Sequence, residues 1–276
     1  MTFANADVLE FYKQLPFNYG ERVEDHAKRI VGHDLTKTYP CLGPVLRKGT
    51  RVLEVGCGVG WLSCGLAYHR KCTVTAIDFN PVVIERARAI AGHMRLPVDF
   101  ETADLFSYEC RQPADVVISL GVLHHTNNCA EAIRRCLRDF TAPRGGHAFI
   151  GLYHLHGRRP FLQHFENMKA AGAGTDQMLQ EYARLHHWLG DKTHLNSWFR
   201  DQVLHPHETQ HTLAEVLEIA DECGFELVST SLNRFEPIVD RGALLAAEPL
   251  QEKIGQERLA AGQYFPGFFA SLFRQC

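Results

Sequence analysis

Residues 52–63 read VLEVGCGVGWLS, and this stretch decides the fold. A short apolar run ends at Val55, glycines follow at positions 56, 58 and 60, and a second apolar segment begins at Trp61. Glycine tolerates positive φ and lets a ligand approach the backbone closely. The stretch therefore predicts a strand, a ligand-binding turn and a helix, although a tight turn without a ligand would use the same residues.

The same alternation continues on both sides of this stretch. The pattern predicts strands at 51–55, 72–77, 97–101, 114–120 and 146–152, with helices at 61–69, 81–93 and 128–140. A later part predicts a helix at 212–223, a strand at 225–232, a helix at 244–260 and a final strand at 264–273. Strands that alternate with helices indicate a mostly parallel sheet covered on both faces. Ligands of such sheets bind beyond the carboxyl ends of the strands.

The spacing of the glycines indicates which nucleotide would bind. A dinucleotide site needs G-x-G-x-x-G, but its third glycine position is Trp61, which disfavours an NAD-dependent oxidoreductase. Glu54 is unfavourable beside a pyrophosphate but suits a ligand that carries an ammonium and a sulfonium. Asp78 stands 22 residues after Gly56, where a carboxylate can accept hydrogen bonds from ribose hydroxyls. Asp104 follows the third strand and could meet an adenine amino group.

Five segments in order resemble the motifs of class I S-adenosylmethionine-dependent methyltransferases. They are VLEVGCGVGWLS (52–63), TAIDFNP (75–81), ETADLF (101–106), ADVVISLGVLHHT (114–126) and APRGGHAFIGLY (142–153). The resemblance covers about residues 50–153 and implies S-adenosylmethionine as cofactor. It also implies a Rossmann-like, seven-stranded α/β sheet with one antiparallel strand near its end, which YFPGFFASLFR (264–274) resembles.

The resemblance carries a set of cofactor-binding residues onto this sequence. It implies that the glycine turn lies beside the methionine part of the cofactor, that Asp78 binds its ribose, and that Asp104 contacts its adenine. The full set is Glu54, Gly56, Gly58, Gly60, Asp78, Phe79, Asp104, Leu105, Ser119 and Leu120. Structural roles remain open for several of them: Glu54 as a solvated strand-end acid, Phe79 as a core aromatic and Ser119 as an ordinary strand-end hydroxyl.

The flanking segments predict a cover over this core. We expect a helical N-terminal cap at 1–48, a cofactor-binding core at 49–155, a helical insertion at 156–212 and the remainder of the sheet at 213–276. The C-terminal half resembles a subset of bacterial methyltransferases with GLY-x-x-x-x-R, R-D-x-x-x-H-x-x-E and P-G-F-F patterns. They stand at 151–158, 200–208 and 266–269.

The chain has 16 histidines, and nine of them lie between His154 and His211. Residues 207–211 read H-E-x-x-H, the spacing of zinc peptidases, but Pro206 favours a turn and no third ligand follows. We therefore predict no metal site, and leave open whether these histidines cap a helix or line an acceptor pocket. Histidine can accept a proton during methyl transfer. The candidate catalytic residues are His124, His125, His154, His207 and His211.

Composition and motifs limit the class of molecule that can accept the methyl group. The net charge is −3, and no Asn-Pro-Pro-Tyr signature follows the fourth strand, which argues against nucleic acid. No apolar run reaches the length of a membrane span, and the first ten residues do not resemble a secretory signal. Nine cysteines without a C-x-x-C pair indicate reduced thiols and a cytoplasmic protein. We expect a methyltransferase for a small polar or anionic molecule; a non-catalytic cofactor-binding scaffold is the alternative. The sequence carries no signal for the oligomeric state.

Overall fold

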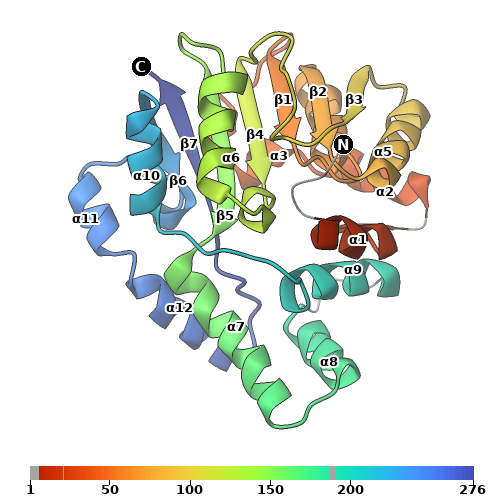
Figure 1. Cartoon of the computed structure of the whole chain (residues 1–276), viewed down its shortest axis with the longest axis vertical. Coiled ribbons are helices and arrows are strands. Elements are labelled where there is room, and N and C mark those ends of the chain that lie inside the picture. Colours follow the sequence, from red (N-terminus) through yellow and green to blue (C-terminus); the bar gives the residue numbers. More distant parts are fainter. Residues whose placement is uncertain (1–5, 21, 187–190) are drawn as a thin grey trace.

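A seven-stranded sheet with strand order β3-β2-β1-β4-β5-β7-β6 forms the centre of the molecule (Figure 1). The computed structural model describes residues 6–20, 22–186 and 191–276. The strands are β1 (Arg51–Val55), β2 (Thr73–Asp78), β3 (Val98–Thr102), β4 (Val116–Leu120), β5 (His147–Tyr153), β6 (Phe225–Thr230) and β7 (Phe268–Gln275). Only β7 runs antiparallel to its neighbours among these strands. The sheet confirms the Rossmann-like architecture expected from the sequence.

Helices cover both faces of the sheet. One face packs against α2 (Val23–Gly32), α3 (Leu35–Thr38), α4 (Trp61–Gly65) and α5 (Pro81–Met94). The other face packs against α6 (Cys129–Arg135) and α10 (Leu213–Glu222). Single helical turns lie at Pro40–Leu42, Leu66–Arg70, Leu123–His125, Cys136–Phe140 and Ser231–Asn233. Because both faces are buried, the inner strands are mostly apolar, which is why the sequence shows runs rather than alternation.

Local sequence brings the ends of β1 and β2 to one edge. The parallel register pairs Val55 with Ile77, so the glycine turn after β1 and Asp78 at the end of β2 lie next to each other. The next helix begins immediately, because Asn80 caps α5 by accepting a hydrogen bond from the Val82 amide and Pro81 occupies the first turn. The chain therefore presents its motifs at the carboxyl ends of the strands.

The insertion after β5 builds a small core of its own. It contains α7 (Leu155–Ala170), α8 (Thr175–Leu185) and α9 (Lys192–Val203), which bury Phe161, Phe165, Tyr182 and Phe199 against one another. Figure 1 shows α9 lying beside α1 (Ala6–Gln14) at the carboxyl ends of β1 and β2. The two covering segments expected from the sequence thus meet over the cofactor edge of the sheet.

Two sequence predictions are wrong in detail. The single helix expected at 244–260 is two helices, α11 (Arg241–Ala246) and α12 (Leu250–Ala260), because the residue before Pro249 is disfavoured in helical conformation. The final strand begins at Phe268 rather than at 264, since Gly267 has φ of 70° and interrupts the extended chain. Within the described part of the chain, no helix combines the length and apolarity that crossing a bilayer requires.

Candidate functional site

The turn after β1 has room only for glycine at two of its three glycine positions. Gly56, Gly58 and Gly60 have φ of 75°, 51° and 75°. A Cβ at Gly56 would stand 2.4 Å from a methyl of Val122, and one at Gly60 would stand 2.9 Å from Phe100. Gly58 has open space beside it. The turn therefore packs closely on two sides and leaves its middle glycine free to approach a ligand.

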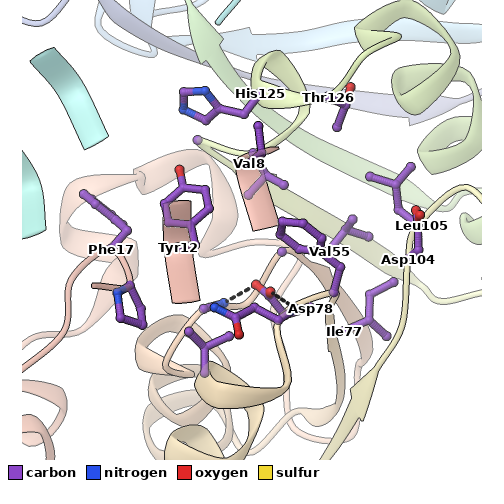
Figure 2. A pocket seen from close by; sticks show the side chains of 18 of the residues that line it. Val8, Tyr12, Phe17, Val55, Ile77, Asp78, Asp104, Leu105, His125 and Thr126 are labelled. Carbon is purple, nitrogen blue, oxygen red and sulfur yellow. Dashed lines mark hydrogen bonds between the residues drawn. The ribbon is translucent and has the colours of Figure 1, made fainter. Parts of the chain in front are cut away.

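Asp78 fastens this turn to the end of β2. Its Oδ2 accepts a hydrogen bond of 2.9 Å from the Gly58 amide, and its Oδ1 accepts one of 2.9 Å from the Asn80 amide (Figure 2). Burial raises the pKa of Asp78 to about 6, although both amides oppose this shift. The carboxylate is therefore held in one orientation at the floor of a pocket, as a ribose-binding group must be.

That pocket runs from the glycine turn to the covering helices and holds about 990 Å³ of space, open solvent at its mouth included. Figure 2 shows Tyr12 and Phe17 on one side and Leu105 on the opposite side. Its lining includes eight of the predicted residues, namely Gly56, Gly58, Asp78, Phe79, Asp104, Leu105, Leu120 and His125.

Three predicted cofactor residues lie behind this lining. Glu54 is 5% exposed and accepts a short hydrogen bond from Ser63, and burial raises its pKa to about 8. Ser119 is buried and donates to the Val55 carbonyl at 3.1 Å, which joins β4 to β1. Gly60 packs against α5. These residues support the pocket wall, and a direct cofactor contact for each stays a prediction.

The sequence predicted five candidate catalytic histidines. The structure does not bring their side chains together at one point. Only His125 lines the pocket. His154 caps α7, because its Nδ1 accepts from the Gly157 amide at 3.1 Å while its Nε2 lies 2.8 Å from Glu248. His124 is completely buried and its ring lies 4.2 Å from that of Tyr153. Neither His154 nor His124 belongs to the pocket lining.

His207 and His211 belong to an extended segment, residues 204–212, that we call the strap. The strap lies between α9 and α10, so the H-E-x-x-H spacing is not on a helix. Thr209 donates to the His124 carbonyl at 2.8 Å, and the His211 amide donates to the Tyr153 carbonyl at 2.9 Å. The His207 carbonyl lies 2.9 Å from Nδ1 of His125. The strap therefore positions the loop after β4, and supports the structural alternative for these two histidines.

Glu208 in the strap forms an ion pair with a buried cation. Its carboxylate forms a bidentate ion pair with Arg158 of α7, at 2.6 and 2.9 Å. The guanidinium also lies 3.8 Å from the centre of the Tyr153 ring. Within the ranges that the structure describes, no cluster of three or more His, Cys, Asp or Glu side chains is arranged to hold a metal. The expectation that no metal is needed stays a prediction.

The sequence analysis did not place Asp201 in the site. This residue of α9 lines the pocket and is 6% exposed. Its Oδ1 accepts a hydrogen bond of 2.5 Å from the Tyr12 hydroxyl of α1. The signal for it was the R-D-x-x-x-H-x-x-E pattern at 200–208, which contains both Asp201 and His205. The ring of His205 lies 3.8 Å from that of His125 and 5.3 Å from that of Tyr12.

Comparisons with known proteins agree with this geometry. Residues 52–145 match the family described as a methyltransferase domain. The chain contains a class I methyltransferase domain. It is 34% identical over 112 residues to a ubiquinone biosynthesis O-methyltransferase of Alkalilimnicola ehrlichii, a match that covers 40% of this chain and 43% of the relative. It is 28% identical over 156 residues to one of Proteus mirabilis, covering 54% and 62%. The chain thus spans less than two thirds of these relatives.

Solved structures show the same fold around the methyltransferase domain. Magnesium protoporphyrin IX methyltransferase from Synechocystis PCC 6803 with bound SAH has a TM-score of 0.55 at 16% identity, covering 99% of this chain and 96% of that one. PKMT2 from Rickettsia typhi in complex with AdoHcy has a TM-score of 0.57 at 15% identity, covering 81% and 48%. The cofactor of the domain is S-adenosylmethionine. The glycine turn, the oriented Asp78 and the pocket fit it, since all three lie at one strand edge.

Proposed function

We propose that the chain transfers a methyl group from S-adenosylmethionine to a small molecule held under α1 and α9. The observation that carries this proposal is one continuous pocket, which joins the glycine turn and Asp78 to Tyr12 and Asp201. A pocket roofed by two helices suits a molecule that enters whole, in a biosynthetic or tailoring step.

The charges of the residues that line the pocket limit the class of acceptor expected from the sequence. Asp78, Asp104 and Asp201 contribute three carboxyl groups, and no Lys or Arg occurs among the described residues that line the pocket. Three acids without a cation would repel an anion. We therefore infer a neutral acceptor in place of an anionic one. Similarity to proteins named O-methyltransferases supports a hydroxyl group as the nucleophile.

The residues of this chain would act mainly by positioning. The bound cofactor supplies a methyl group that is already activated by a sulfonium. The glycine turn and Asp78 would hold that cofactor at the strand ends, and Tyr12 and Phe17 would close the acceptor side and exclude water. Alignment of two reacting groups can supply about 7–11 kcal/mol of the barrier. Proton removal from the acceptor is the remaining task.

His125 is the candidate from the sequence analysis that stays in the pocket. Its Nδ1 lies 2.9 Å from the His207 carbonyl, which fixes the direction of the ring. Burial lowers the pKa of His125 to about 3, so the imidazole is neutral at pH 7 and would hold a transferred proton weakly. We therefore assign His125 to orienting the acceptor, and another group must take the proton.

A labelling experiment tests the proposed function. The protein is mixed with methyl-labelled S-adenosylmethionine and a bacterial extract divided into small molecules and macromolecules. We expect calorimetric binding of S-adenosylmethionine and S-adenosylhomocysteine but not of NAD, and label in the small-molecule fraction. Label in protein or nucleic acid would contradict the proposed acceptor class. Cofactor binding without transfer to either fraction would support the scaffold alternative.

A further inference from the structure

A buried carboxyl group faces the pocket from the insertion. Asp201 belongs to α9, on the covering side of the pocket, whereas Asp78 belongs to the sheet edge. The Tyr12 hydroxyl donates to its Oδ1 at 2.5 Å. Helix α1 is held there by a second contact, because Arg200 lies 4.7 Å from the centre of the Phe11 ring and donates to Gln14 at 3.0 Å. Asp201 is therefore positioned rather than loosely exposed.

A structural role does not account for this carboxyl group. Burying a carboxylate is unfavourable unless a cation accompanies it. The positive charge of Arg158 lowers the pKa of Asp201. The hydrogen bonds of Arg158, however, go to Glu208 and to the carbonyls of Gln202 and Pro266. Asp201 forms no ion pair in the part of the chain that the structure describes. A buried acid without a salt bridge at a ligand pocket is typical of functional sites.

Several titratable groups face Asp201 from the surrounding elements. Burial raises the pKa of Asp201 to about 7, while the Tyr12 hydrogen bond and the Arg158 charge lower it and Glu208 raises it. The groups are Tyr12 of α1, Tyr153 of β5, Arg158 of α7, Tyr182 of α8, Glu208 of the strap and Tyr264 before β7. A base that titrates near pH 7 is well matched to proton transfer in a cell.

We propose that Asp201, positioned by Tyr12, takes the proton from the hydroxyl group of a neutral, weakly acidic acceptor while that oxygen is methylated. This inference rests on the proposed function. The O–H bond breaks and its proton passes to the Asp201 carboxylate. The acceptor oxygen forms the new bond to the methyl carbon, and the electron pair of the broken C–S bond stays on sulfur. The products are a methyl ether, a neutral thioether and a protonated Asp201.

The surroundings of Asp201 indicate a phenol-like acceptor. Val8, Pro16, Phe17 and Val122 supply an apolar lining suited to a flat, apolar body. An amine already carries a free electron pair as its neutral form, so it needs no base before it attacks. A hydroxyl is a poor nucleophile until its proton is removed, and a buried carboxylate without a salt bridge serves that need.

Matched phenols test this proposal. We choose p-cresol, which is neutral at pH 7, and 4-hydroxybenzoate, which adds a carboxylate. Wild-type protein with S-adenosylmethionine should convert p-cresol to 4-methylanisole with one S-adenosylhomocysteine per product, and should favour p-cresol over 4-hydroxybenzoate. Asp201→Asn should lower kcat by at least about 100-fold, the usual scale for a lost base. Its affinity for S-adenosylhomocysteine should stay within about twofold, because Asp201 touches the acceptor side.

Two readouts separate a base from a merely structural residue. Tyr12→Phe should move the midpoint of the kcat–pH profile to higher pH, since the hydrogen bond from Tyr12 lowers the pKa of Asp201. In the S-adenosylhomocysteine complex, an infrared carboxylic-acid band should titrate near pH 7 and be missing in Asp201→Asn. Asp176→Asn, an exposed acid of α8, removes the same charge outside the pocket and should change neither readout.

Each outcome decides a different point. Wild-type turnover in Asp201→Asn, or an unchanged midpoint in Tyr12→Phe, would overturn the role of Asp201. Binding of S-adenosylmethionine without methylation of p-cresol, or a preference for 4-hydroxybenzoate, would overturn the acceptor class. Failure to bind S-adenosylmethionine at all would instead refute the proposed function on which the inference rests.

Discussion

Asp78 connects the glycine turn to the pocket through a single side chain. Its two oxygens accept from the Gly58 and Asn80 amides, so its orientation is set before any ligand arrives. Hydrogen bonds to a charged group typically contribute about 1.5–3 kcal/mol. The residue thus holds the turn, and we expect it also to bind the ribose, so its substitution should affect both.

We expect Asp78→Ala to weaken binding of S-adenosylmethionine by roughly 1.5–3 kcal/mol, measured by titration calorimetry. Asp99→Ala is the matched control, because Asp99 is an exposed acid on the neighbouring strand β3 and lies outside the pocket lining. An Asp78→Ala variant with wild-type affinity would remove this residue from the cofactor site.

Glu54 should link cofactor binding to pH. Burial raises its pKa to about 8, so the group is mostly protonated at pH 7 before the cofactor binds. A nearby positive charge lowers the pKa of a carboxyl group, so binding should release a proton, and affinity should rise between about pH 6 and 8. Calorimetry in two buffers of different ionisation enthalpy measures that proton. Glu54→Gln should abolish its release, and equal release in the variant would exclude Glu54 as the source.

At the scale of elements, the strap joins the insertion to the sheet. Its backbone bonds reach the loop after β4 and the end of β5, while Glu208 pairs with the completely buried Arg158. Glu248 plays a similar part, because it accepts from two amides at the start of α10 and contacts His154. Glu208, Glu248 and His154 are thus engaged by partners within the protein.

Glu208→Gln should destabilise the fold by about 3–5 kcal/mol, because it leaves a buried guanidinium without its counter-charge. Denaturant unfolding monitored by circular dichroism measures the change. Glu226→Gln removes the partner of Arg274 in an exposed ion pair, which is worth at most about 1 kcal/mol. Equal effects of the two substitutions would show that the strap ion pair does not stabilise the molecule.

For the whole molecule, the buried acids and histidines make stability depend on pH in opposite directions. Burial lowers the pKa values of His26 and His125 to about 4 and about 3. Below about pH 6.5 the unfolded chain therefore binds protons that the folded protein does not, so acid destabilises the fold. Burial raises the pKa values of Glu54 and Asp201, so their folded forms retain protons that the unfolded chain has lost. Among these four groups, only the two acids destabilise the folded state above about pH 6.5.

The cofactor-free protein should therefore lose stability as the pH rises from about 6.5 to 8.5. Thermal unfolding at matched ionic strength measures this loss. The double variant with Glu54→Gln and Asp201→Asn should lose less stability over the same range, since neither amide can ionise. A wild-type protein whose stability rises over this interval would contradict the assigned burial of the two acids.

The sheet, its helical faces and the cofactor edge follow from local sequence. They depend on the apolar runs between residues 51 and 273, on Gly56 and Gly60, which leave no room for a side chain, and on Asp78. Local order along the chain decides them, because parallel strands must place their carboxyl ends at one edge. The resemblance to methyltransferases rests on the same local motifs.

The acceptor side depends on the tertiary structure. The sequence left open whether the five candidate histidines cap a helix or line an acceptor pocket. Capping and strap contacts engage the rings of His154, His207 and His211. His124 is buried beside Tyr153, and of the five only His125 lines the pocket. Asp201 is positioned in the site by a hydrogen bond from Tyr12, which lies 189 positions away in the sequence. Periodicity and spacing describe neighbours along the chain. They cannot show which distant helix will cover a pocket, because that depends on how the insertion packs.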